Sequence, residues 1–177
     1  MPIKLYTIGH GTRPLEEFGK VLQAHGIQRL VDIRTIPRSR HNPQFNKDSF
    51  PKELKKLKIS YRHMPELGGL RKAKKDSVNL AWKNASFRGF ADYMQTEDFE
   101  RGLAELTELA EKETIAIMCA ESVPWRCHRS LISDALSARG LAVEHIYSGT
   151  SSKKHKMTPW ARVEGKQVTY PAEKKDG

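Results

Sequence analysis

Residues 114–129 have the sequence Thr-Ile-Ala-Ile-Met-Cys-Ala-Glu-Ser-Val-Pro-Trp-Arg-Cys-His-Arg, and this stretch decides the predicted fold. Its apolar run predicts a buried strand over 114–118 that ends at Cys119, and a helix is predicted over 124–139 after a polar turn. A strand that ends where a helix begins presents free backbone N–H groups and the positive end of the helix dipole. The junction is therefore typical of an anion-binding site, with two arginines and a thiol beside it.

The alternation of strands and helices continues on both sides of this stretch. Strands are predicted over 5–8, 30–33, 59–63, 114–118 and 141–146, and helices over 12–26, 47–58, 87–94, 99–111 and 124–139. This order predicts an α/β fold with a mainly parallel sheet of about five strands and helices on both faces. We expect a single domain over 1–149 and a basic, loosely structured C-terminal tail over 150–177, with a short hairpin at 161–169.

Composition limits the class of protein. The net charge is +10, with 31 Lys and Arg against 21 Asp and Glu, which favours acidic partners, although a solubilising surface would give the same balance. No apolar run reaches about 18 residues and the start lacks a signal-peptide pattern, so we expect a cytoplasmic protein with no membrane partner. Two cysteines eight residues apart indicate reduced thiols rather than a disulfide scaffold.

Polar segments follow four of the predicted strands: 9–12, 34–40, 66–69 and 120–129. Because ligands bind outside the carboxyl ends of parallel strands, these segments should line one pocket. The glycines of 9–12 could also bring backbone amides close to a phosphate. The candidate ligand-binding residues are His10, Thr12, Arg34, Arg38, Arg40, Glu66, Arg88, Trp125, Arg126, Cys127, His128 and Arg129.

Two arginines should hold the anion. Arg126 and Arg129 are three apart and would share one helix face, where a bound anion would satisfy both, with Arg34 and Arg38 assisting. The alternative is that Arg126 and Arg129 form ion pairs with Glu121 or Glu66 instead of binding a ligand.

Cys119, Glu121 and Asp32 are the candidate catalytic residues. A thiol at a strand end, beside a helix N-terminus and arginines, should have a lowered pKa and act as a nucleophile, although Cys119 could equally close a buried strand. Asp32 or Glu121 would act as acid or base, or would orient an arginine. The spacing of Cys119, Cys127 and His128 matches no compact zinc pattern, so we predict no metal site, and nothing indicates a cofactor.

These observations favour binding of a phosphate-bearing ligand, a nucleotide or nucleic acid, with or without processing of it. One alternative is a cysteine-dependent enzyme, similar to a phosphatase or a sulfurtransferase, with Cys119 as nucleophile. Another is a non-catalytic nucleic-acid-binding module whose basic tail holds the nucleic acid.

Several motifs in one order resemble a known family. They are Thr-Ile-Gly-His-Gly-Thr (7–12), Val-Asp-Ile-Arg (31–34) with Pro-Arg-Ser-Arg (37–40) and Asn-Pro-Gln-Phe-Asn (42–46), Pro-Glu-Leu-Gly-Gly (65–69), Phe-Arg-Gly-Phe-Ala-Asp-Tyr-Met (87–94), and Met-Cys-Ala-Glu (118–121) with 124–132. Over residues 4–148 the chain resembles the bacterial and archaeal domain-of-unknown-function family 488. The resemblance implies a small cytosolic α/β domain and supplies no settled activity or catalytic residues. The order of elements is also similar, more weakly, to rhodanese-like domains.

Overall fold

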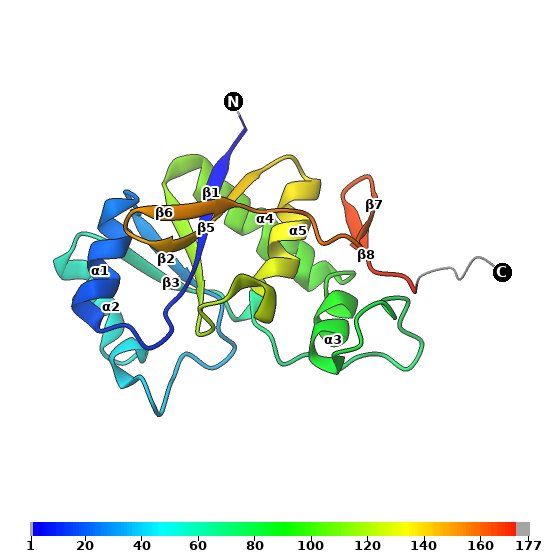
Figure 1. The fold of residues 1–177 in the computed structure, drawn as a ribbon, viewed down its shortest axis with the longest axis horizontal. Coiled ribbons are helices and arrows are strands. Elements are labelled where there is room, and N and C mark those ends of the chain that lie inside the picture. The colour runs from blue at the N-terminus through cyan, green and yellow to red at the C-terminus, as the bar shows by residue number, and fades with distance from the viewer. Residues whose placement is uncertain (1, 173–177) are drawn as a thin grey trace.

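The computed structural model describes residues 2–172, and its centre is a six-stranded sheet (Figure 1). The strand order is β3-β2-β4-β1-β5-β6, in which all neighbours are parallel except β5 and β6. The strands are β1 (Lys4–Gly9), β2 (Arg29–Asp32), β3 (Ser60–His63), β4 (Ile115–Cys119), β5 (Ala142–Ser148) and β6 (Ser151–Lys154). The predicted α/β fold with a mainly parallel sheet is confirmed.

Helices cover both faces of the sheet. They are α1 (Leu15–Ala24), α2 (Phe50–Lys56), α3 (Ala85–Tyr93), α4 (Glu97–Lys112) and α5 (Arg129–Ala138), with short 3-10 turns at Pro43–Phe45, Pro65–Leu67 and Pro124–Arg126. Figure 1 shows α1 and α2 on one side of the sheet and α4 and α5 on the other. The described chain is thus a sheet between two helical layers, as alternating strands and helices require.

The central strand β4 divides its side chains between the two cores. Ile115, Ile117 and Cys119 pack in the core under α3, α4 and α5, whereas Ala116 and Met118 pack in the core under α1 and α2. Successive side chains of a strand point to opposite faces, so this alternation is expected. It places the Cys119 thiol on the face that α5 covers.

The connections after β2 and β4 leave the sheet in opposite directions. These strands are neighbours, but the chain passes from β2 to α2 on one face and from β4 to α5 on the other. Such a switch point opens a crevice at the carboxyl ends of the two strands, and this is where parallel sheets bind ligands.

The start of α5 differs from the prediction. The helix predicted over 124–139 was wrong at its beginning: Pro124–Arg126 form a separate 3-10 turn, Cys127 is extended, and α5 begins at Arg129. Pro124 is favourable at the first position of either kind of helix, so the sequence did not distinguish the two. The extended residue carries the Cys127 side chain back toward β4.

The C-terminal part is more ordered than a loosely structured tail. Ser151–Lys154 add the antiparallel edge strand β6, which the sequence did not predict because it is polar throughout. The expected hairpin is present as β7 (Arg162–Glu164) and β8 (Gln167–Thr169), and Tyr170 after it is fully buried. Residues 173–177 of the predicted tail lie outside the described residues. Within 2–172, no helix combines the length and apolarity that a bilayer crossing requires.

Candidate functional site

Two free thiols meet where β4 ends and α5 begins. The Sγ atoms of Cys119 and Cys127 are 2.7 Å apart, and the Cys127 thiol donates a hydrogen bond to Cys119. The two side chains are 3% and 6% exposed. The extended backbone at Cys127 makes this contact possible across eight residues of sequence.

Arg129 lies beside the thiols as an incompletely paired buried cation. The side chain is fully buried, and its Nη2 donates to the carbonyl oxygen of Ser122 at 2.9 Å. Its Nε and Nη1 atoms have no hydrogen-bond partner among residues 2–172. A buried charge without a counter-ion is costly, so the site favours negative charge next to Arg129.

The two thiols differ in acidity as a result. Burial raises the pKa of the Cys119 thiol, but the hydrogen bond from Cys127 and the charge of Arg129 outweigh it, and the pKa falls below its ordinary value. Burial and the hydrogen bond to Cys119 raise the pKa of Cys127 well above its ordinary value. Cys119 is therefore the sulfur that ionises first, with Cys127 as its hydrogen-bond donor.

The turn after β1 holds the thiol loop from the other side. The amides of His10 and Gly11 donate to the carbonyl oxygens of Cys119 and Ala120, at 3.0 and 2.9 Å. A side chain at Gly9 would collide with the carbonyl group of Glu121, so this close approach requires glycine. The sequence predicts that these amides approach a phosphate. In the structure they bind and position the loop that follows Cys119.

A cavity of about 350 Å³ opens in front of the thiols, at the switch point between β2 and β4. Its apolar wall includes Ile36, Leu70, Phe87 and Phe90. Seven of the predicted site residues line it: Arg34, Arg38, Cys119, Glu121, Arg126, Cys127 and His128. Of the four segments predicted to converge, those after β2 and β4 line the cavity and 66–69 contributes Gly69, whereas 9–12 contributes no residue to its lining.

Arg34 and Asp32 form a buried ion pair behind the cavity. Asp32 accepts hydrogen bonds from Nε and Nη2 of Arg34 at 2.9 and 2.7 Å, and the side chains are 0% and 6% exposed. Asp32 also accepts from the Tyr61 hydroxyl, whose pKa is raised by burial and by this carboxylate. Asp32 thus orients Arg34. Because Asp32 also neutralises the guanidinium charge, Arg34 is less suited to bind an anionic ligand.

His128 is a neutral imidazole between the cavity and the core. Burial, together with the charges of Arg129 and Arg71, lowers its pKa to about 4. Its Nε2 lies 3.1 Å from the Leu67 carbonyl oxygen and so carries the proton, which leaves Nδ1 as an acceptor 3.6 Å from Cys127 Sγ. His128 is thus a neutral hydrogen-bond acceptor beside Cys127.

The remaining predicted residues lie outside the cavity lining. His10 borders Arg34, with 3.5 Å between Nε2 and Nη1, and Arg129 lies behind the thiols. Arg88 donates to the carbonyl oxygens of Trp82 and Lys83, and Glu66 lines a separate cavity with Tyr93. Thr12, Arg40 and Trp125 are exposed on the surface.

Sequence reasoning missed part of the apolar wall. Ile36 and Leu70 line the cavity while 61% and 77% exposed. They lie in irregular segments without periodicity, so no pattern marked them. An exposed apolar residue beside a glycine pair, as Leu70 is beside Gly69, is the one signal that could have done so.

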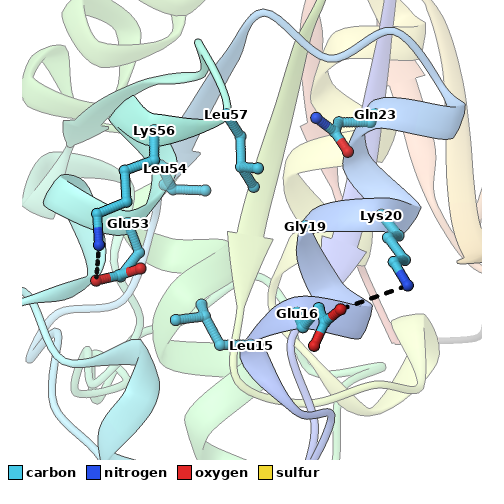
Figure 2. A pocket seen from close by; sticks show the side chains of 9 residues that line it. All are labelled: Leu15, Glu16, Gly19, Lys20, Gln23, Glu53, Leu54, Lys56 and Leu57. Atoms are coloured by element: carbon cyan, nitrogen blue, oxygen red, sulfur yellow. Dashed lines mark hydrogen bonds and ion pairs between the residues drawn. The ribbon is translucent and has the colours of Figure 1, made fainter.

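A larger cavity of about 480 Å³ lies elsewhere, between α1 and α2 (Figure 2). Its wall includes Leu15 and Leu57, and its rim carries the ion pairs Lys20–Glu16 at 3.5 Å and Lys56–Glu53 at 3.0 Å. The charged groups pair with each other, and no thiol or imidazole lines it. We therefore assign the candidate site to the smaller cavity, where the reactive side chains are.

Fold and site together define an α/β protein with a buried dithiol at the carboxyl edge of a mainly parallel sheet. A model of the family described as Domain of unknown function DUF488 matches residues 14–136, well over half of the chain, and the protein belongs to that family. The matched segment includes both thiols and Arg129, and it confirms the resemblance found in the sequence motifs. No curated protein and no solved structure matches the chain.

Proposed function

We propose that this protein binds a phosphate-bearing ligand in the cavity at the carboxyl ends of β2 and β4. The observation that carries the proposal is the absence of a carboxylate partner for Arg38 and Arg126 among the described residues. Both line the cavity, both are exposed, and neither pairs with a carboxylate among the described residues. Two exposed arginines elsewhere do pair, Arg101 with Asp98 and Arg162 with Glu164, whereas Arg40 lies close to the cavity segment in sequence and forms no ion pair among the described residues.

The remaining walls favour a nucleotide unit over inorganic phosphate alone. A guanidinium group suits bidentate binding of phosphate oxygens, and the net charge of +10 attracts anions toward the protein. The rings of Phe87 and Phe90 offer an apolar surface for a flat base. A volume of about 350 Å³ is near the lower end of small-molecule sites, so one nucleotide unit fits it better than several.

Glu121 gives the cavity a carboxylate, which constrains the ligand. Its Oε1 accepts the backbone N–H of Val123 at 3.1 Å, and this holds the side chain in place. A carboxylate repels phosphate and accepts hydrogen bonds, so it should contact a sugar hydroxyl or a base amino group. The ligand class is therefore one that carries both a phosphate and hydrogen-bond donors.

Equilibrium binding tests this proposal with inorganic phosphate, mononucleotides, and short single-stranded DNA and RNA. Arg126→Ala should weaken binding by about 10-fold, which corresponds to one charge-assisted contact of about 1.4 kcal/mol. If a nucleic acid is the ligand, the slope of log affinity against log salt should also fall by about one.

The matched control is Arg162→Ala, which removes the same charge from the exposed hairpin strand β7. Its affinity should remain within about twofold of the unmodified protein, since unspecific attraction depends only on net charge. Equal losses in Arg126→Ala and Arg162→Ala would show that the cavity is not the binding site.

A further inference from the structure

The thiol pair has the geometry of a redox couple. A disulfide S–S bond is about 2.05 Å long, so the sulfurs of Cys119 and Cys127 need to approach by only about 0.65 Å from their separation of 2.7 Å to form one. Both residues line the cavity, so a small reactant can reach them there.

The charge around the pair distinguishes the two sulfurs. Arg129 is fully buried, with two nitrogen atoms unpartnered among residues 2–172, and its charge favours a thiolate at Cys119. Cys127 keeps its proton and donates a hydrogen bond to Cys119, and His128 Nδ1 lies 3.6 Å from the Cys127 sulfur. One ready nucleophile beside one protonated thiol is the arrangement that thiol–disulfide exchange requires.

We propose that Cys119 and Cys127 are a catalytic dithiol that reduces low-molecular-weight disulfides, with Cys119 as the attacking and Cys127 as the resolving thiol. The low exposure of the two side chains, 3% and 6%, selects this class of substrate. A small disulfide can enter the cavity, whereas a disulfide held on the surface of a folded protein cannot reach its floor.

The oxidation of the dithiol balances with the disulfide RSSR as the only other reactant. The Cys119 thiolate attacks one sulfur of the disulfide RSSR, forms a Cys119–S–S–R mixed disulfide and releases RS⁻. Cys127 then gives its proton to the released RS⁻, and its thiolate attacks Cys119 Sγ and displaces the second RS⁻. The second RS⁻ takes from solvent the proton that Cys119 released when it ionised. Two thiols RSH therefore leave, the substrate is reduced by two electrons, and the protein dithiol is oxidised to a disulfide. A low-molecular-weight thiol then reduces the protein disulfide and restores the dithiol.

Mass spectrometry of the reduced protein, treated with oxidised glutathione without any phosphate ligand, tests the proposal. The unmodified protein should lose two hydrogen masses as it forms the Cys119–Cys127 disulfide, without an adduct. Cys127→Ser should stop at a single glutathione adduct on Cys119. Cys119→Ser should react at least about 100-fold more slowly, because only the less acidic thiol remains.

Two further measurements keep the result clear. Cys119 in the folded, unmodified protein should react with oxidised glutathione faster than in the same protein in denaturant. This measurement does not depend on the folding of any variant. Arg129→Met should move the pH dependence of the reaction to higher pH, whereas Arg162→Met should leave it in place, and a purely structural role of Arg129 would not shift it.

Equal adduct rates at the two cysteines, or slower reaction in the folded than in the denatured protein, would overturn the dithiol proposal. Because phosphate is absent from the assay, that outcome leaves the ligand-binding proposal standing. Loss of ligand binding in Arg126→Ala with normal disulfide exchange would support both.

Discussion

Two buried polar clusters share the helix α5, and they differ in how completely their groups are paired. The first, the thiol cluster, consists of Cys119, Cys127 and Arg129, and two nitrogen atoms of its arginine are unpartnered among residues 2–172. The second, the Asp134 network, is a chain of hydrogen bonds around a fully buried carboxylate on the same helix. Cys119 and Cys127 of the thiol cluster line the cavity of about 350 Å³, and no residue of the Asp134 network lines that cavity.

The Asp134 network joins the C-terminal segment to the sheet. Asp134 accepts hydrogen bonds from His155 Nε2 at 2.7 Å, the Thr158 amide at 3.0 Å and the Tyr170 hydroxyl at 2.6 Å. His155 Nδ1 contacts His145 Nε2 on β5 at 2.8 Å. A buried polar network in which every group is hydrogen-bonded stabilises one fold. A buried charge without a partner lowers stability, and a bound or nearby negative charge can compensate for this loss. We therefore propose that Asp134, in the middle of α5, stabilises the fold, and that Arg129, at the start of α5, serves the dithiol.

The largest effect is expected from Asp134→Ala. The substitution leaves the Tyr170 hydroxyl, the Thr158 amide and His155 without their acceptor in the core, so we expect a loss of about 3–5 kcal/mol in the free energy of unfolding. Urea denaturation followed by circular dichroism measures it. Asp98→Ala is the control, since that carboxylate is exposed and its pair with Arg101 should contribute less than about 1 kcal/mol. A loss below about 1 kcal/mol in Asp134→Ala would mean that the network does not hold the C-terminal segment.

A smaller effect is expected from pH at the far end of the same network. Burial, together with the neighbouring His155 and Arg129, lowers the pKa of His145 to about 3. The unfolded chain binds this proton near pH 6.5 and the folded chain does not, so stability falls as pH decreases below about 6.5. His145 alone should cost about 2 kcal/mol at pH 5 relative to pH 7.

The change in slope, not the absolute stability, isolates His145. The slope of unfolding free energy against pH between 7 and 5 measures the protons taken up on unfolding. In His145→Gln this slope should decrease by the contribution of one proton, even if the variant is less stable throughout. His10 and His128, whose pKa values burial lowers to about 4, retain their share. His41→Gln changes an exposed histidine and is the control. An unchanged slope in His145→Gln would show that the imidazole is protonated in the folded protein.

The fold was largely predictable because apolar periodicity marks its elements. The strand ending at Cys119 is fully buried and reads as a continuous apolar run, so its position was correct to one residue. Edge strand β6 was not predicted because it consists of serines and lysines, and an exposed edge strand does not need apolar residues. The beginning of α5 was wrong because a proline starts either kind of helix equally well, and only tertiary contacts select the turn.

The candidate site was predictable in outline and not in detail. Strand order brings the segments after β2 and β4 together, and this follows from an α/β pattern. The extended residue Cys127 is what separates the two arginines expected on one helix face, since Arg126 ends exposed and Arg129 ends buried. The Asp134 network joins residues up to 36 positions apart, and such long-range contacts leave no local pattern in a single sequence.

The smallest change in stability is expected from Arg129→Met, and its sign separates the two clusters. The substitution removes one hydrogen bond to Ser122 but also removes a buried charge that has no counter-ion, and methionine fills much of the same volume. These contributions oppose each other, so the free energy of unfolding should stay within about 1 kcal/mol of the unmodified protein or rise. Urea denaturation beside Asp134→Ala compares the two ends of one helix under the same conditions. A loss of 3 kcal/mol or more would make Arg129 a structural residue like Asp134, because only a cation that is already neutralised in the folded state contributes stability of that size.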